Sequence, residues 1–221
     1  MSNVRYRIRF VFLLIFIFSG LISTGFYFWK NNQIKSATHN NRNAFNREAN
    51  SYNVSIKINN HAAGLKKYAM ANGFSANYCM MVDMHIASGK PRFFLYDLQQ
   101  DTVLLSGLVT HGSGSDRGLD DLFFSNQPNS NCTSLGKYRI GKSYYGKFGL
   151  AYKLNGLDNT NSAAFKRFVV LHAHECVPAA AVYPQEICQS WGCPTVAPVF
   201  LSTISKYIDQ SPKPILLEIY Y

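Results

Sequence analysis

The sequence predicts a mostly β domain with one helix near each end, preceded by an N-terminal transmembrane helix. Three observations favour this class. Between residues 79 and 171, β-branched and aromatic residues gather in short runs separated by glycine, proline and asparagine, as is typical of strands and turns. Apolar residues at helical spacing flank this region on both sides. An uncharged apolar run fills residues 10–29.

Residues 1–30 predict a signal anchor that spans the membrane. Arg5, Arg7 and Arg9 precede the uncharged run, and twenty residues in a helix rise about 30 Å, the thickness of the hydrocarbon layer. Because the basic residues are N-terminal, the rest of the chain should lie outside the cytoplasm. A cleaved signal peptide is the alternative, but its apolar region would be shorter and would end in a small-residue cleavage site.

The formal net charge of +10 is partly a property of this first segment. Four of the 22 Lys and Arg residues, and none of the 12 Asp and Glu residues, lie in the first thirty positions. The remaining positive charge is scattered, without the basic block or aromatic stripe of nucleic-acid-binding proteins. We therefore expect no nucleic-acid partner and a surface that suits an anionic polymer.

Two further parts follow the anchor. Residues 31–58 are polar and rich in asparagine, which predicts a stalk. Residues 59–221 predict the folded domain, and 47% hydrophobic residues in the chain are enough for one good core.

The predicted domain begins and ends with regular elements. A helix over residues 59–72 ends at Gly73 as its C-cap, and a second helix over 198–208 starts with Pro198. Strands are predicted over residues 79–86, 92–98, 102–109, 138–140, 150–154, 168–171 and 215–220.

The segment Ser190-Trp191-Gly192-Cys193-Pro194 is a candidate acyl-transfer site. A thiol becomes a good nucleophile when a base lowers its pKa and backbone N–H groups receive the oxyanion that it creates. Glycine directly before Cys193 lets the backbone turn tightly enough to aim those N–H groups. His172 follows an apolar run, and a loop can bring its imidazole back to the thiol.

Two alternatives use the same part of the chain. A histidine near a strand end is often structural, which weakens His111, His172 and His174 when each is taken alone. His172, His174 and Cys176 or Cys193 could also chelate zinc, but structural zinc sites usually show C-x-x-C or H-x-x-x-H spacing. We therefore expect no metal and no external cofactor.

Five cysteines in an exported domain raise the question of disulfides. If Cys193 stays free, then Cys79, Cys132, Cys176 and Cys188 remain, with three possible pairings. Cys176 and Cys188 flank one loop and could form a disulfide that closes it. A buried free thiol is an equal alternative for any of the four.

The chain carries a run of ordered motifs. The first is His172, seventeen residues and then Ser190-x-Gly192-Cys193, which resembles the signature of the murein L,D-transpeptidases, the YkuD-like catalytic domain family. Upstream segments resemble the branch that is often found in Gram-negative bacteria, and the similarity covers residues 72–221. These segments are Val82-Asp83-Met84, Arg92-Phe93-Phe94, Tyr96-Asp97-Leu98, His111-Gly112-Ser113-Gly114-Ser115, Phe124-Ser125-Asn126, Ser134-Leu135-Gly136-Lys137-Tyr138, Gly156-Leu157-Asp158 with Asn161, and Leu171-His172-Ala173.

The resemblance implies an L,D-transpeptidase-like β-sandwich with peripheral helices and a cysteine acyl-enzyme. It makes Cys193 the nucleophile, His172 the base and the Ala173 carbonyl the group that orients this base. Backbone N–H groups at Gly192 and Cys193 would form the oxyanion hole, and Ser190 would support the turn.

Two positions depart from the commoner family pattern. Trp191 stands where that pattern has histidine, and Thr195 stands where it has asparagine or arginine. The carboxylate of the stem peptide must then bind to other side chains. We expect the substrate-binding residues among His111, Arg117, Arg139, His174 and Trp191.

The predicted function is a cysteine-dependent peptidoglycan L,D-transpeptidase that acts on stem tetrapeptides through a thioester. With water as acceptor the same enzyme would be an L,D-carboxypeptidase, and an inactive wall-binding module is a third hypothesis. The expected partners are peptidoglycan stem peptides and, through the predicted anchor, the inner membrane, with the domain in the periplasm. The sequence leaves the oligomeric state open.

Overall fold

In a computed structural model of the chain, residues 27–30, 32, 52–118 and 121–221 are described. The chain divides into two compact units, Met1–Ile56 and Lys57–Tyr221. The strands and the candidate site belong to the second unit. The predicted stalk over residues 31–58 and the domain over residues 59–221 stay predictions.

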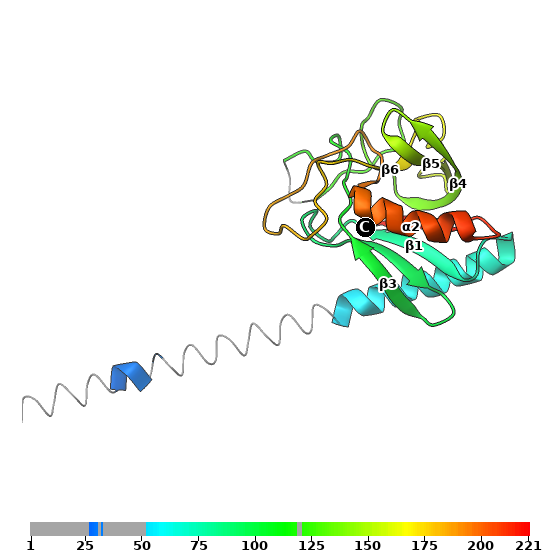
Figure 1. Ribbon diagram of the computed structural model, residues 1–221. Helices are drawn as coiled ribbons and strands as arrows, with labels where there is room; N and C mark the ends of the chain where they lie inside the picture. The colour runs from blue at the N-terminus through cyan, green and yellow to red at the C-terminus, as the bar shows by residue number, and fades with distance from the viewer. Residues whose placement is uncertain (1–26, 31, 33–51, 119–120) are drawn as a thin grey trace, which may run out of the picture. The chain divides into compact units, whose positions relative to one another are not determined.

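The second unit consists mainly of β-strands with two helices, and Figure 1 colours these elements by their position along the chain. A helix runs from residue 52 to residue 72. The other elements are β1 (Tyr78–Asp83), β2 (Phe93–Asp97), β3 (Thr102–Gly107), β4 (Gly136–Gly146), β5 (Gly149–Gly156), β6 (Val170–Ala173), β7 (Thr195–Val196), α2 (Pro198–Gln210) and β8 (Leu216–Tyr220).

These strands form one sheet in the order β3-β2-β1-β8-β4-β5-β6-β7. The pairs β1–β8 and β6–β7 are parallel, and the other neighbours are antiparallel. Just after edge strand β3, Val109 bridges to Val196 in the opposite edge strand β7. The sheet therefore curls until its two edges meet.

This topology corrects the predicted β-sandwich. A sandwich consists of two sheets that face each other, whereas here a single curled sheet has the two ends of its strand order joined at the Val109–Val196 bridge. The prediction of a mostly β domain with peripheral helices is confirmed.

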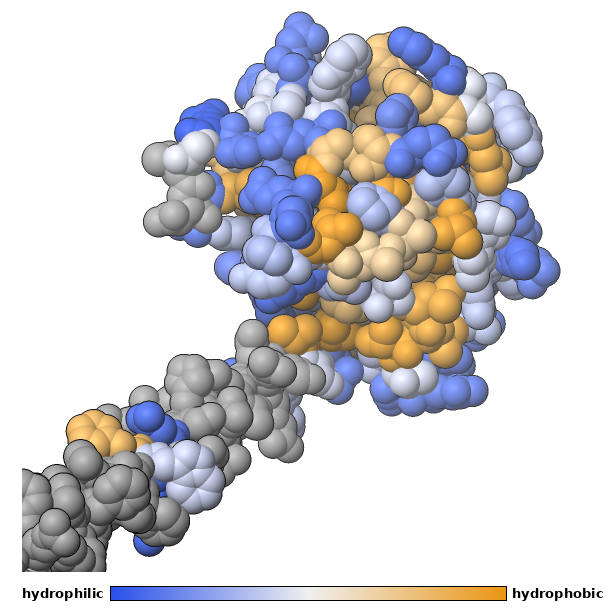
Figure 2. All heavy atoms as spheres, turned by 60° about the vertical axis from the view of Figure 1, so that its left-hand side comes forward, coloured by the Kyte–Doolittle hydropathy of each residue, from blue (hydrophilic) through white to orange (hydrophobic). Residues whose placement is uncertain are grey.

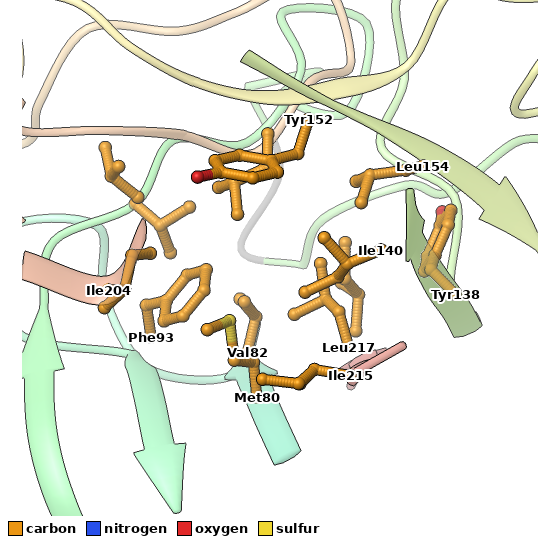
Figure 3. Close-up of a cluster of buried hydrophobic side chains, with 14 of the residues drawn as sticks. Met80, Val82, Phe93, Tyr138, Ile140, Tyr152, Leu154, Ile204, Ile215 and Leu217 are labelled. Carbon is orange, nitrogen blue, oxygen red and sulfur yellow. The ribbon is translucent and has the colours of Figure 1, made fainter. Parts of the chain in front are cut away.

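The two helices cover opposite faces of the central strands. Because side chains alternate between the two faces of a strand, different residues of one strand contact each helix. On one face, Phe93 packs edge-on against Phe200 of α2, and on the other, Tyr96 donates a hydrogen bond to Asn59 of the helix over residues 52–72. The main core lies on the α2 side (Figure 3), where Met80, Val82, Phe93, Leu217 and Ile204 are almost completely buried.

Most predicted elements are confirmed, with shifted ends. The short strands expected over 138–140 and 150–154 extend into the hairpin β4–β5, where the part of β4 beyond Ile140 has no buried side chain and so lacks the alternation of a half-buried strand. β6 begins at Val170 rather than at residue 168, because Phe168 has a positive φ of 56° that no strand residue adopts. The two-residue strand β7 was not predicted.

The transmembrane helix predicted over residues 1–30 requires a correction of the fold class. In the described ranges, none of the helices combines the length and the apolar character that crossing a membrane demands. Of the predicted segment, only residues 27–30 are described, as one short helical stretch, and residues 1–26 lie outside the described residues.

Candidate functional site

An open cleft of about 740 Å³ lies where the two edges of the sheet meet. It is lined by the tip of the β4–β5 hairpin, by β6 with the turn before it, and by the segment that leads into β7. Its lining includes Tyr144, Lys147, Phe148, Lys166, Arg167, Phe168, Val170, His172, His174, Ser190, Trp191, Cys193 and Thr195. Figure 2 shows that hydrophobic side chains also reach the surface of this unit, bordered by hydrophilic ones.

Gly192 makes the tight turn before the candidate nucleophile. Its φ is +106°, and a Cβ at this position would lie 2.6 Å from the Cys132 carbonyl oxygen. Any other residue would therefore combine backbone strain with a steric clash. The prediction that glycine is needed here for geometric reasons is supported by both observations.

Ser190 stabilises the same turn with its hydroxyl group. Ser190 Oγ donates to the Cys193 carbonyl oxygen at 2.6 Å and accepts from Gly192 N–H at 3.1 Å. The segment after β3 adds another hydrogen bond, since Thr110 Oγ1 also donates to the Cys193 carbonyl oxygen, at 3.1 Å. The closing of the sheet edges thus fixes the backbone on both sides of the thiol.

The Cys193 sulfur points toward the turn that precedes β6. Sγ accepts a hydrogen bond from Val170 N–H at 3.5 Å and donates toward the Phe168 carbonyl oxygen at 3.8 Å. Burial raises the pKa of the Cys193 thiol, and the Val170 N–H and the positive charge of Arg167 oppose this rise only in part. At neutral pH the thiol is therefore protonated.

His172 is held from both ring nitrogens. Nδ1 lies 3.1 Å from the Ala173 carbonyl oxygen, so Nδ1 carries the proton and donates it there. Nε2 then accepts from Thr195 Oγ1 at 3.0 Å. Phe148 stacks on the ring at 4.7 Å between centroids, and burial lowers the pKa of His172.

The structure brings His172 and Cys193 to the same cleft without a direct hydrogen bond between their side chains in the described chain. His172 pairs with Thr195 in the parallel β6–β7 register, two residues beyond the cysteine. The imidazole is neutral and offers its Nε2 lone pair. The pair is therefore neutral thiol and neutral imidazole, a combination suited to general-base catalysis.

This ionisation state predicts a steep pH dependence for alkylation of Cys193 by iodoacetamide. Only the thiolate reacts, so below a raised pKa the rate should grow roughly tenfold per pH unit between about pH 6 and 8. Peptide mapping by mass spectrometry gives the rate at Cys193 separately from the buried thiols Cys79 and Cys132. A rate that is flat over this range would indicate a preformed thiolate–imidazolium pair and contradict the assignment.

The backbone N–H groups of the turn are not equivalent. Gly192 N–H is bonded to Ser190 Oγ, whereas the hydrogen bonds of the described residues leave Cys193 N–H without an acceptor. Of the two groups expected in the oxyanion hole, Cys193 N–H is thus ready to receive a developing oxyanion.

The predicted substrate-binding residues fall into two groups. Trp191 and His174 line the cleft, and the Trp191 side chain is 81% exposed. His111, Arg117 and Arg139 lie outside its lining, since Arg117 covers the Phe123 ring and Arg139 lies on β4 opposite Asn155.

His111 is buried, in contact with a buried arginine. Its Nδ1 accepts from Arg92 at 3.0 Å, and burial together with the charge of Arg92 lowers the pKa of His111 to about 4. Its backbone carbonyl accepts from Ser190 N–H at 2.9 Å. His111 thus lies next to the nucleophile turn while its side chain faces the interior.

Sequence reasoning missed several cleft residues, above all Arg167. Arg167 Nη2 donates to the Cys132 carbonyl at 2.6 Å, directly beneath Gly192. The ion pairs between described residues do not include it. The position of Arg167 shortly before His172 on the same segment could have indicated a place in the cleft. Nothing in the sequence around Lys147 and Phe148, at the tip of the hairpin, indicated such a place.

A disulfide joins Cys176 to Cys188, one of the pairings left open by the sequence, while Cys79, Cys132 and Cys193 are free. Both bridged residues line the cleft. Because Cys176 is bonded to Cys188, it cannot act as a thiolate ligand to zinc. Among the described residues, no group of three His, Cys, Asp or Glu side chains is placed to hold a metal ion.

Removing this disulfide should destabilise the unit without unfolding it. For a loop of this length, with 12 residues of separation, chain entropy accounts for about 3 kcal/mol of the unfolding free energy. The loop keeps Val177 and Ile187 in a small apolar cluster. Urea unfolding of the double variant Cys176→Ser/Cys188→Ser should therefore match that of reduced wild type. Equal stability of the oxidised wild type and the variant would refute this expectation.

Comparisons with known proteins place these features in a family. A family model described as an L,D-transpeptidase catalytic domain matches residues 40–214. A search of curated proteins gives no match.

Solved structures with some similarity include two proteins named L,D-transpeptidases and one named a cell shape determining protein. An L,D-transpeptidase of Enterococcus faecium is 11% identical with a TM-score of 0.40, and the match covers 65% of this chain and 50% of that one. An L,D-transpeptidase of Mycobacterium smegmatis is 11% identical with a TM-score of 0.37, covering 66% and 59%. The helical cell shape determining protein Pgp2 of Campylobacter jejuni is 9% identical with a TM-score of 0.43, covering 64% and 46%.

The match spans about half the length of the Enterococcus faecium and Campylobacter jejuni proteins. Their identity and TM-scores are too low to bear on function. The family model, in contrast, covers well over half of the chain. The chain belongs to the L,D-transpeptidase catalytic domain family.

Proposed function

We propose that this protein is a cysteine-dependent peptidoglycan L,D-transpeptidase that acts on stem tetrapeptides. Membership of the family supports an enzyme that acts on peptidoglycan. The observation that carries the finer assignment is the shared cleft, which holds the Cys193 thiol and the His172 imidazole beside the unbonded Cys193 N–H.

Acylation begins when Cys193 Sγ attacks the carbonyl carbon of the residue before a terminal D-alanine. His172 Nε2 takes the thiol proton, and the carbonyl π electrons move to the oxygen, which Cys193 N–H receives. When the oxyanion collapses, the bond to D-alanine breaks. His172 returns the proton to the leaving amine, and a thioester remains on Cys193.

Deacylation repeats these steps with an amine from a neighbouring stem. The amine attacks the thioester carbon and loses a proton to His172, and Cys193 leaves as a thiolate that this proton neutralises. The product is a new amide cross-link. With water as the acceptor, the product is a free carboxylate, the L,D-carboxypeptidase reaction.

Proton transfer from the thiol requires two small rearrangements. The sulfur leaves the Val170 N–H by rotation to another staggered rotamer, and the Thr195 hydroxyl turns away from His172 Nε2. The Nδ1 bond to the Ala173 carbonyl persists and keeps Nε2 as the acceptor, which supports Ala173 as the orienting group.

The charge of the cleft supports an anionic substrate. Its described lining includes Lys147, Lys166 and Arg167 and no Asp or Glu. Stem peptides end in a carboxylate, which such a cleft attracts. The proposed substrate-binding residues are therefore Lys147, Lys166, Trp191 and His174, in preference to His111, Arg117 and Arg139.

The test is incubation of the protein with tetrapeptide muropeptides, followed by mass spectrometry of the products. Wild type should release D-alanine and form cross-linked dimers, and Cys193→Ala should form neither. Tripeptide products without dimers would instead identify the carboxypeptidase. Identical product spectra for wild type and Cys193→Ala would refute the catalytic proposal and favour a wall-binding module. A substrate in the cell wall implies that the enzyme works in the cell envelope.

A further inference from the structure

Phe168 has a backbone conformation that is unfavourable for its residue type. The helical turn before it ends with the hydrogen-bond pair of a Schellman motif, Phe168 N–H to the Phe165 carbonyl and Val169 N–H to the Ala164 carbonyl, at 3.1 and 3.0 Å. In this motif, residue 168 takes the left-handed position with φ of 56°. Glycine is the usual residue there, because a side chain crowds the following carbonyl group.

The Phe168 side chain gives no packing in return for this strain. It is 84% exposed, and together with Tyr145 it has the highest exposure of the large hydrophobic side chains in the described residues. The ring and cation–π contacts between described residues do not include it. Stability therefore does not explain a phenylalanine at this position, and an outlier of this kind is typical of functional sites.

The place of Phe168 supplies a reason. Phe168 belongs to the lining of the cleft, together with the exposed Trp191. Its carbonyl oxygen lies 3.8 Å from Cys193 Sγ. This residue of the cleft lining therefore combines a strained backbone, a carbonyl close to the sulfur and an exposed aromatic side chain.

We propose that Phe168 is a substrate-contacting residue that determines specificity by packing its ring against the aliphatic part of the acyl-donor peptide. The neighbouring Lys147 and Lys166 suit the carboxylates of the same peptide. This inference rests on the proposed function, since it assigns a binding contact in the same cleft. Binding would cover apolar ring surface that is exposed in the free protein.

The test replaces Phe168 by glycine, which keeps the left-handed backbone and the carbonyl but removes the ring. Binding of a tetrapeptide muropeptide is measured by calorimetry in the non-reactive Cys193→Ala background. The dissociation constant should rise about tenfold when an aromatic contact is lost. The melting temperature should rise by about 2 °C, because glycine relieves the backbone strain.

Two further variants separate the ring from the backbone. Phe168→Tyr keeps an aromatic ring and should bind the peptide within about twofold of the parent. Asp101→Gly is the matched control, since Asp101 also has a positive φ, 48°, and lies in the exposed turn between β2 and β3, outside the cleft. This control should leave the affinity unchanged.

The outcomes distinguish this inference from the proposed function. Equal affinity of the parent and Phe168→Gly, or a lower melting temperature of Phe168→Gly, would overturn the role of Phe168 even if Cys193 is essential for turnover. If instead Cys193→Ala retains full activity, the proposed function fails, whereas the binding measurement still reports on Phe168.

Discussion

Replacing His172 by glutamine is expected to slow acyl-enzyme formation about a thousandfold, because the thiol then has no base to take its proton. The pKa of Cys193 is raised by burial, so the thiolate fraction at neutral pH is too small to compensate. The measurement is the rate of covalent modification by a carbapenem or a tetrapeptide donor, followed by intact mass.

The neighbouring histidine provides the control for this prediction. His174 lines the same cleft but is exposed, and its Nδ1 only accepts from Cys176 N–H. His174→Gln should change the acylation rate by less than about tenfold. A His172→Gln protein that folds, by circular dichroism, and acylates at the wild-type rate would exclude His172 as the base.

Replacing Gly192 by alanine should abolish activity and lower the unfolding free energy by about 3 kcal/mol. The new methyl group would meet the Cys132 carbonyl oxygen at 2.6 Å, and the residue would keep a φ of +106° that alanine rarely adopts. The backbone must then shift, which moves Cys193 N–H and the thiol out of position. Urea unfolding and the muropeptide assay measure the two effects.

Gly73→Ala is the matched control, because Gly73 also has a positive φ, +76°, but nothing lies within 4 Å of its Cβ position. It ends the helix over residues 52–72, away from the cleft. This variant should lose only about 1 kcal/mol and keep its activity. If Gly192→Ala also lost only about 1 kcal/mol and kept its activity, the predicted clash with the Cys132 carbonyl would be wrong.

The sequence predicted the central strands because their signals are local. Strands β1, β2 and β8 are buried and apolar, and α2 carries both a helical period and Pro198 at its start. It could not predict that the sheet curls, because the Val109–Val196 bridge joins segments far apart in the chain. The family resemblance pointed to a sandwich, and only the strand order corrects this.

The part of the cleft that holds Cys193 and His172 contains residues singled out in the sequence, whereas most of the other lining residues were not. Cys193, Gly192, Ser190, His172 and Ala173 form contiguous motifs whose chemistry is readable. The binding side depends on which side chains the fold exposes. An exposed histidine and a buried one look alike in sequence, so His111 was expected in the cleft although its ring contacts Arg92 in the interior.

Phe168 is the clearest case of a residue whose exposure could not be predicted from the sequence. Within the apolar run 168–171 it reads as the first residue of a strand, and nothing in that run signals a left-handed turn. The hydrogen bonds from Phe168 and Val169 back to the preceding turn impose the conformation. Its role at the cleft becomes visible only once the exposure of its ring is known.

The most direct measurement of the central claim is the mass of the covalent intermediate. The protein is mixed with a tetrapeptide donor, quenched in acid and mapped by tandem mass spectrometry. The account predicts an acyl-tripeptide adduct on the Cys193 sulfur that forms in wild type and not in His172→Gln. Turnover with the adduct on another residue, or with none on Cys193 at any time point, would contradict it.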